Sequence, residues 1–192
     1  METIAVVDIE TTGFSNSRDA ILEVGIAELN LKTGKIEPLY DALVKEAHFT
    51  ADHEKSWIFD NSDLDYEHIL KAEPLDIEKI QEILNTYHAT AYNKVFDFGF
   101  LKNRGLEVKE LPCPMLLATN VCKIPSPKRP GSYKWPKVQE AWDIFFGKEE
   151  EYIEKHRGLD DAIHEAKIVF YLFQQGVFKV PEICEDPEPK KG

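Results

Sequence analysis

The hydrophobic residues of this chain follow two periods, and each period predicts a different kind of element. Near the N-terminus they form runs with strand character, over residues 4–7, 20–31 and 36–44. A turn that contains Gly34, a residue suited to positive φ, joins the last two runs. This part of the chain therefore predicts an antiparallel meander of three strands.

Further along, the apolar residues change to helical spacing. This spacing predicts helices over residues 76–87, 96–104, 137–146 and 159–175, with a short strand at 88–92. Asp76 is a suitable N-cap, and Gly147 and Gly176 follow the last two helices as stops. Three strands followed by alternating helix and strand predict an α/β fold, with a mixed sheet covered by helices.

The composition is that of a globular protein, because 43% of the 192 residues are hydrophobic and 30% are charged. We expect one domain over residues 1–178 and a flexible tail at 179–192, where three prolines and mixed charges gather. No apolar run is long enough to span a membrane, and no signal segment is recognisable. Cys113, Cys122 and Cys184 are scattered, which indicates free thiols rather than a zinc site. These features predict a cytoplasmic protein.

The net charge of −12 argues against a protein that coats nucleic acid nonspecifically, since such proteins have basic surfaces. It does not exclude an enzyme that acts on nucleic acid, because metal ions can supply the positive charge in an acidic active site.

Two acids stand at the end of the first predicted strand. Side chains alternate along a strand, so Asp8 and Glu10 project from the same face, about 7 Å apart. Two buried carboxylates repel each other and lose their hydration, and both costs destabilise the fold unless a nearby cation offsets them. The pair therefore predicts a metal site.

Two further segments offer acids to this site. Asp97 lies at the start of a predicted helix. There it either interacts favourably with the helix dipole or acts as a ligand at a strand-to-helix turn. In the last helix, Asp161 shares a row with apolar residues, whereas Asp160 shares a polar row, so we expect Asp161 to face inward. His156 reaches the same place only if it precedes the helix on a loop, which Gly158 makes feasible.

Residues 8–13, 93–101 and 156–162, in this order, closely resemble the three motifs of the DEDDh group of 3'-to-5' exonucleases, which includes polymerase proofreading subunits and several exoribonucleases. His156 and Asp161 stand at the expected separation of five residues. The resemblance covers residues 3–175. Tyr92 is a departure, because the second motif often has histidine there, and the poorly matched middle region implies no choice of substrate.

The resemblance implies a ribonuclease-H-like fold, with a five-stranded mixed sheet flanked by helices. It also implies two divalent ions, Mg²⁺ or Mn²⁺, which suit oxygen ligands and in-line displacement at phosphorus. Asp8, Glu10 and Asp161 would hold one ion. Asp8 would bridge to the second, which Asp97 orders, and His156 would be the general base that deprotonates the attacking water. The product would be a 5'-nucleoside monophosphate.

Substrate contacts are also implied by the resemblance. Thr11 and Thr12 would meet the terminal 3' hydroxyl, and Asn93 would contact the substrate from the second motif. Phe14 would stack against a terminal base, while Phe98 would either do the same or belong to the core.

Residues 111–139 contain no acid, although the chain is acidic overall. Lys128, Arg129 and Lys134 alternate there with Tyr133 and Trp135, and several prolines predict a loop. Cations beside aromatic rings suit a single strand of nucleic acid. The alternative is a solvated loop whose Trp135 is anchored on the following helix.

The leading hypothesis is a metal-dependent 3'-to-5' exonuclease acting on single-stranded or frayed 3' ends of DNA. Its rivals are an exoribonuclease, a catalytically silent module that binds nucleic-acid ends, and a ribonuclease-H-type endonuclease, which would give no reason for His156. The sequence leaves open a polymerase or repair partner and the oligomeric state.

Overall fold

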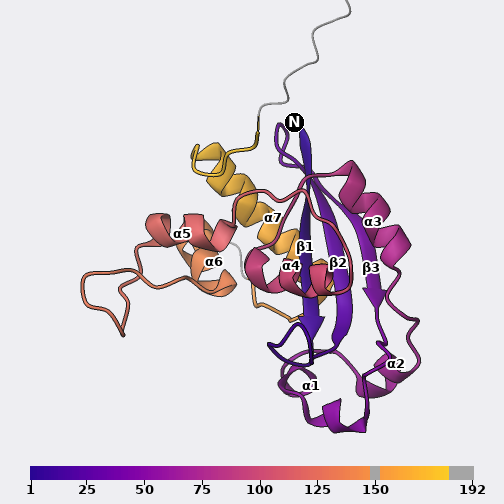
Figure 1. Cartoon of the computed structure of the whole chain (residues 1–192). Coiled ribbons are helices and arrows are strands. Elements are labelled where there is room, and N and C mark those ends of the chain that lie inside the picture. Colours follow the sequence, from indigo (N-terminus) through magenta and orange to yellow (C-terminus); the bar gives the residue numbers. More distant parts are fainter. Residues whose placement is uncertain (148–151, 182–192) are drawn as a thin grey trace, which may run out of the picture.

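The computed structural model describes residues 1–147 and 152–181 of the chain. Within this part the sheet has four strands in the order β3-β2-β1-β4 (Figure 1). Strands β1 (Thr3–Thr11), β2 (Ile21–Asn30) and β3 (Ile36–Leu43) form the predicted antiparallel meander, and β4 (Ala89–Thr90) lies parallel to β1. The sheet is therefore mixed, as expected.

The expectation of five strands is wrong for the described residues. The fifth position is reduced to a single parallel bridge between Ala89 and Glu110, where Leu111 N donates to Ala89 O at 2.8 Å. Pro112 follows at once, and a proline has no N–H with which to continue a ladder. The edge therefore ends after one bridge.

Helices form at all four predicted positions, with ends that differ by at most two residues: α3 (Ile77–Thr86), α4 (Lys94–Asn103), α6 (Val138–Phe146) and α7 (Gly158–Gln174). Four more were not predicted: the 3-10 helix η1 (Ala51–Lys55), α1 (Trp57–Asn61), α2 (Tyr66–Leu70) and α5 (Pro114–Cys122). The first three are too short to show a repeat. The fourth lies in the segment that was expected to be a loop. A helix can begin there despite Pro114, because this proline occupies the first turn, where proline is well tolerated.

The two faces of the sheet are covered by different helices (Figure 1). Ile4 and Val6 of β1 belong to a hydrophobic cluster with α5, α6 and α7, whereas Ala5 and Val7 belong to a cluster with α3 and α4. This alternation is the period of two that a strand buried on both faces requires. A third cluster packs the segment with α1 and α2 under one end of the sheet.

Helix α7 begins in unusually close contact with β2. A Cβ atom on Gly25 would lie 2.0 Å from the backbone carbon of Gly158, so the two backbones touch. Beside them Arg157 donates to both carboxylate oxygens of the buried Glu23, at 2.8–3.2 Å, and Gly158 N donates to Glu23 Oε2 at 2.9 Å. Because Gly25 pairs with Asp8 in the sheet, this contact places the start of α7 next to the acid-bearing strand.

Among the described residues, no helix combines the length and the apolar character needed to cross a bilayer. The expected tail lies outside the described residues from residue 182 onward, and so does Cys184. Cys113 and Cys122 are free thiols, as predicted.

Candidate active site

A pocket of about 520 Å³ lies at the end of β1, between α4 and the start of α7. Its walls include all five residues for which the sequence predicts chemistry: Asp8, Glu10, Asp97, His156 and Asp161. Segments far apart in the sequence thus converge on one place. We call it the active-site pocket.

Strand β1 and helix α4 supply the first three carboxylates. The register of β1 against β2 shifts between Glu10 and Thr11, so the strand is irregular just beyond the two acids. Asp97 lies in the first turn of α4 and is only 4% exposed. Asp97 fits both alternatives that the sequence offered. Its side chain is close to a helix N-terminus, where it can interact with the helix dipole, and it also faces the pocket, where it can act as a ligand.

Helix α7 and the loop before it supply the other two groups. Asp161 is 3% exposed and faces inward, as predicted, whereas Asp160 is partly exposed and pairs with Lys155 at 3.0 Å. His156 precedes the helix in the left-handed conformation, with φ of 54°. As a result, one ligand atom each of Glu10, His156 and Asp161 lies within 4.8 Å of the others.

Hydrogen bonds hold the Asp161 carboxylate in place. The hydroxyl of Tyr152 donates to Oδ1 at 2.5 Å, and the backbone N–H of Arg157 donates to Oδ2 at 2.9 Å. Tyr152 stacks on His164, with ring centroids 4.0 Å apart. Asp161 therefore has a fixed orientation before any ligand binds.

The electrostatics of the pocket favour a cation. Burial, followed by the negative charge of Glu165, raises the pKa of Asp8 well above its ordinary value. Burial also raises the pKa of Glu10 well above its ordinary value, and that of Asp97 to about 7. Asp8 Oδ2 is buried and accepts no hydrogen bond from any described residue. A divalent ion would satisfy this oxygen and offset the repulsion, so the residues present fit a metal site.

The cost of ionising these buried carboxylates predicts that the stability of the metal-free protein depends on pH. Asp97 ionises near pH 3.8 in the unfolded chain but near pH 7 in the folded protein, so its contribution to stability is present at low pH and lost as the pH rises through 7. In EDTA, the melting temperature should therefore fall as the pH rises from about 4 to about 7, and Mn²⁺ should raise it most at the upper end of that range. Calorimetry at several pH values tests this, and a melting temperature that rises over this range without metal would contradict it.

Two carboxylates near the site were not predicted. Glu165 lies one turn after Asp161, is 3% exposed and accepts a hydrogen bond from Tyr92 N at 3.2 Å. Burial, followed by the charge of Asp97, raises its pKa well above the ordinary value. Its place in the row of Asp161 was a usable signal. Glu154 lines the pocket, with Oε1 4.0 Å from His156 Nδ1, and nothing distinguishes it in the sequence from the acids around it.

The end of β1 and the loop that joins it to β2 carry three of the predicted substrate contacts. Thr11, Thr12 and Phe14 all line the active-site pocket, and Phe14 is 93% exposed. The Thr12 hydroxyl accepts a hydrogen bond from Ala20 N at 2.9 Å, which closes the base of the loop.

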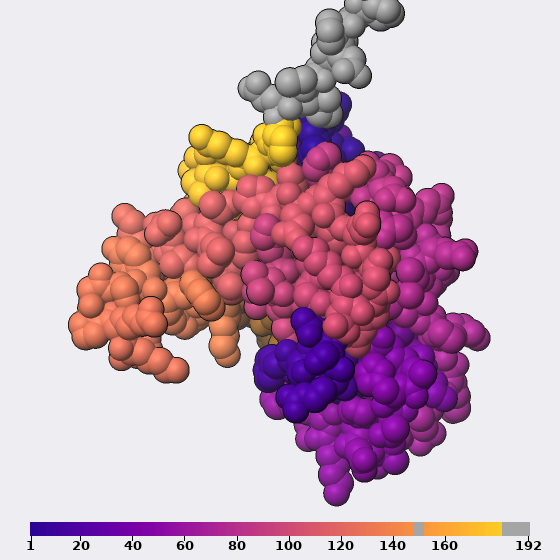
Figure 2. All heavy atoms as spheres, in the orientation of Figure 1, coloured from indigo at the N-terminus to yellow at the C-terminus, as the bar shows by residue number. Residues whose placement is uncertain are grey.

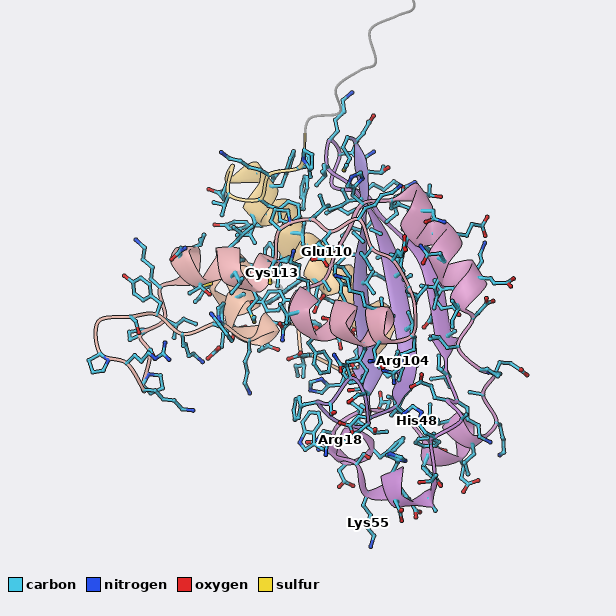
Figure 3. The ribbon with its side chains drawn as sticks, viewed as in Figure 1. Arg18, His48, Lys55, Arg104, Glu110 and Cys113 are labelled. Carbon is cyan, nitrogen blue, oxygen red and sulfur yellow. The ribbon has the colours of Figure 1, made fainter. Side chains whose placement is uncertain are left out.

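A largely shielded ion pair fixes this loop from the side of α4. Arg104, labelled in Figure 3 at the end of that helix, binds both carboxylate oxygens of Glu46 at 2.7–2.8 Å. The same guanidinium donates to the backbone carbonyl of Asp19 at 2.8 Å and to that of Asn16. Phe14 is therefore exposed on a loop that is held at several points.

The other predicted contacts lie outside the active-site pocket. Residues 124–134 form a short hairpin, closed by Ser126 N donating to Ser132 O at 2.9 Å. Lys128 and Arg129 are exposed on it, whereas Lys134 binds Glu140 at 2.5 Å. Asn93 is exposed and lines a neighbouring pocket.

The structure places three aromatic residues that the sequence singled out. Trp135 is 65% exposed and lines the neighbouring pocket, so it is not a buried anchor. Phe98 is 1% exposed and belongs to the core. Tyr92 is also buried, and its hydroxyl donates to Pro136 O at 3.1 Å, which ties the start of α4 to the segment that follows the hairpin.

Several solved structures are similar to this chain in fold. The nuclease domain of 3'hExo, described as a DEDDh family member bound to rAMP, is 18% identical, with a TM-score of 0.65 over 94% of this chain and 96% of that chain. Cell-death related nuclease 4 is 14% identical, with a TM-score of 0.64 over 92% of this chain and 65% of that one. E. coli exonuclease I, in complex with a dT13 oligonucleotide, is 11% identical, with a TM-score of 0.67 over 90% of this chain and 41% of that one. The chain thus spans less than two thirds of the length of the last two.

No curated protein matches the chain in sequence. A model of the exonuclease family RNase_T, in contrast, matches residues 5–169, which include every acid of the site and His156. The protein therefore belongs to this exonuclease family, and the resemblance to its DEDDh group is confirmed.

Proposed function

We propose that this protein is a metal-dependent 3'-to-5' exonuclease that releases 5'-nucleoside monophosphates from single-stranded or frayed 3' ends of DNA. The observation that carries the proposal is the convergence of the four predicted carboxylates and a histidine in one pocket, where Asp8 Oδ2 is buried without a partner among the described residues. A binding module would need neither the unpaired oxygen nor the histidine. The exonuclease domain would take in residues 1–178.

Each side chain has a task in this proposal. Asp8, Glu10, Asp97 and Asp161 would hold two divalent ions, Mg²⁺ or Mn²⁺, which supply positive charge to the attacking and leaving oxygens when bound. His156, 28% exposed at its side chain, takes a proton from the attacking water and passes it to solvent.

The remaining pocket residues position the end of the strand. Thr11 and Thr12 contact the terminal 3' hydroxyl, and Phe14 lies against the terminal base. The proposed compartment is the cytoplasm, which the free thiols of Cys113 and Cys122 support.

The test uses 5'-labelled single-stranded DNA and RNA of the same sequence, with Mg²⁺ or Mn²⁺. A ladder that shortens by one nucleotide at a time from the 3' end supports the proposal, and the ratio of the two rates decides between DNA and RNA. Internal cuts would indicate an endonuclease. If neither polymer is cleaved in a metal-dependent way, the proposal that the protein is an enzyme is wrong.

The role of His156 can be tested separately. His156→Asn should lower kcat by about 100-fold to 10,000-fold, the usual contribution of a general base, while the affinity for the strand is kept. His68→Asn, on the exposed face of α2, is the matched control and should behave as the wild type. Single-turnover rates and equilibrium binding separate the two effects. A loss confined to affinity would argue against the general base.

A further inference from the structure

A second pocket, of about 510 Å³, adjoins the active-site pocket, and both share Phe14 and Phe96 as walls. We propose that this second pocket, called here the upstream pocket, holds the bases that precede the 3'-terminal nucleotide of an unpaired strand. The inference rests on the proposed function and names the form of substrate that the site accepts.

Several exposed hydrophobic side chains gather around this pocket. Among the described residues nine large hydrophobic side chains are exposed, and four of them line the upstream pocket: Phe14 (93%), Val95 (75%), Leu116 (45%) and Trp135 (65%). They come from four separate segments of the chain. Exposed apolar side chains that gather in this way mark a binding surface rather than a packing defect.

The chemistry of the walls selects bases over phosphates. None of the side chains that line the upstream pocket is charged, so no wall residue there can neutralise a phosphate. Aromatic rings such as Phe14 and Trp135 stack on any base, whatever its identity. Asn16 and Asn93 add amide groups, and Asn93 caps α4 without using its side chain for the cap. The amides can therefore meet the polar edges of bases.

Positive charge lies beyond the pocket, where the backbone of a bound strand would leave it. Figure 2 shows the hairpin standing out from the body of the molecule, with an open notch between it and the loop after β1. Lys128 and Arg129 are exposed on this hairpin, and neither makes an ion pair with another described residue. The bond from Tyr92 to Pro136 fixes the chain just after Trp135. Phosphates of a strand leaving the pocket would therefore meet these two cations.

The geometry accordingly favours an unpaired end several nucleotides long. A base that stacks in a pocket of the protein cannot also stack within a duplex, so a paired end would have to open first. A free mononucleotide fills the active-site pocket alone and gains nothing from the upstream pocket.

The experiment measures equilibrium binding and does not depend on cleavage. An Asp8→Asn background prevents hydrolysis, and fluorescence anisotropy reports binding of a single-stranded oligonucleotide of about twelve nucleotides, which matches the span of similar single-strand sites. On this background Trp135→Ala should weaken binding by about 5-fold to 150-fold, the usual effect of removing one stacking ring. The affinity for a nucleoside 5'-monophosphate should stay the same.

Ile144→Ala is the control, because Ile144 is an exposed hydrophobic residue of α6, is 48% exposed and lines neither pocket. It should keep the affinity for the oligonucleotide. Replacing Lys128 and Arg129 with alanine should reduce the salt dependence of that affinity by up to about two counterions.

If Trp135→Ala lowers the affinities for the oligonucleotide and the mononucleotide equally, or lowers neither, the proposed role of the upstream pocket is wrong. Absence of cleavage by the wild type with Trp135-dependent binding intact would overturn the proposed function alone.

Discussion

Asp8→Asn is expected to slow cleavage by at least about 1,000-fold without unfolding the protein. The metal ions of such a site supply several kcal/mol of stabilisation to the transition state, and each 1.4 kcal/mol is a factor of ten in rate. An amide keeps the shape of Asp8 but lacks the charge that a divalent cation requires. Single-turnover cleavage of a labelled strand measures the loss.

The same change should stabilise the metal-free protein. Burial, followed by the charges of the neighbouring carboxylates, raises the pKa of Asp8, and an uncharged amide relieves both effects. The melting temperature in EDTA at about pH 8 should therefore be higher for Asp8→Asn than for the wild type, and Mn²⁺ should raise it less. This pair of opposite effects distinguishes a metal ligand from a residue that merely supports the fold.

Asp160→Asn is the matched control, since Asp160 is adjacent to Asp161 in the sequence but pairs with Lys155 at the surface. It should retain nearly full activity and should respond to metal as the wild type does. A loss of activity in Asp160→Asn equal to that in Asp8→Asn would contradict the assignment of Asp8.

Gly25→Ala is expected to cause the largest loss of stability among single methyl additions to this protein. The new Cβ atom would lie 2.0 Å from the backbone of Gly158, and a backbone atom cannot move aside as the end of a side chain can. Inserting one methyl group into a well-packed core costs about 1–3 kcal/mol, and a collision between backbones should exceed that range. Urea unfolding measures the change in the free energy of unfolding.

Gly99→Ala tests whether this effect depends on the site. Gly99 lies within α4, and a Cβ there would meet the end of the Asn16 side chain at 3.2 Å, which is able to shift. Alanine also favours a helix over glycine by about 1 kcal/mol, so this variant should be neutral or slightly more stable. Similar destabilisation by both alanines would show that the contact between β2 and α7 is not special.

Gly25→Ala should also reduce activity in the fraction that folds. Any shift of the start of α7 away from β2 moves Asp161 and the loop of His156 away from Asp8, which pairs with Gly25 in the sheet. Activity should therefore fall by more than the folded fraction alone explains.

The sequence predicted the elements that are long enough to repeat their hydrophobic pattern. Strands β1 to β3 and helices α3, α4, α6 and α7 each repeat their apolar positions several times, and the acids on them could be assigned to a face before the structure was known. The row of Asp161 on its helix predicts that this residue, rather than Asp160, faces inward. The three motifs then brought all five residues of the site together.

Other features depend on contacts that no local pattern records. The short helices α1 and α2 have five residues each, which is little more than one turn. Trp135 looks the same in the sequence whether it packs on a helix or lines a pocket, because Phe14 and Leu116, which line that pocket with it, come from distant segments. The fifth strand followed from the family resemblance, and a proline limits it here to one bridge.

The left-handed backbone of His156 has a consequence for the timing of events at the site. A residue other than glycine seldom adopts a φ of 54° unless its surroundings impose it. Here the backbone N–H groups on both sides of it, those of Lys155 and Arg157, donate to the same Asp161 carboxylate, at 3.4 and 2.9 Å. The backbone that carries the imidazole is thus set during folding, so little backbone entropy is left to be lost there when substrate arrives.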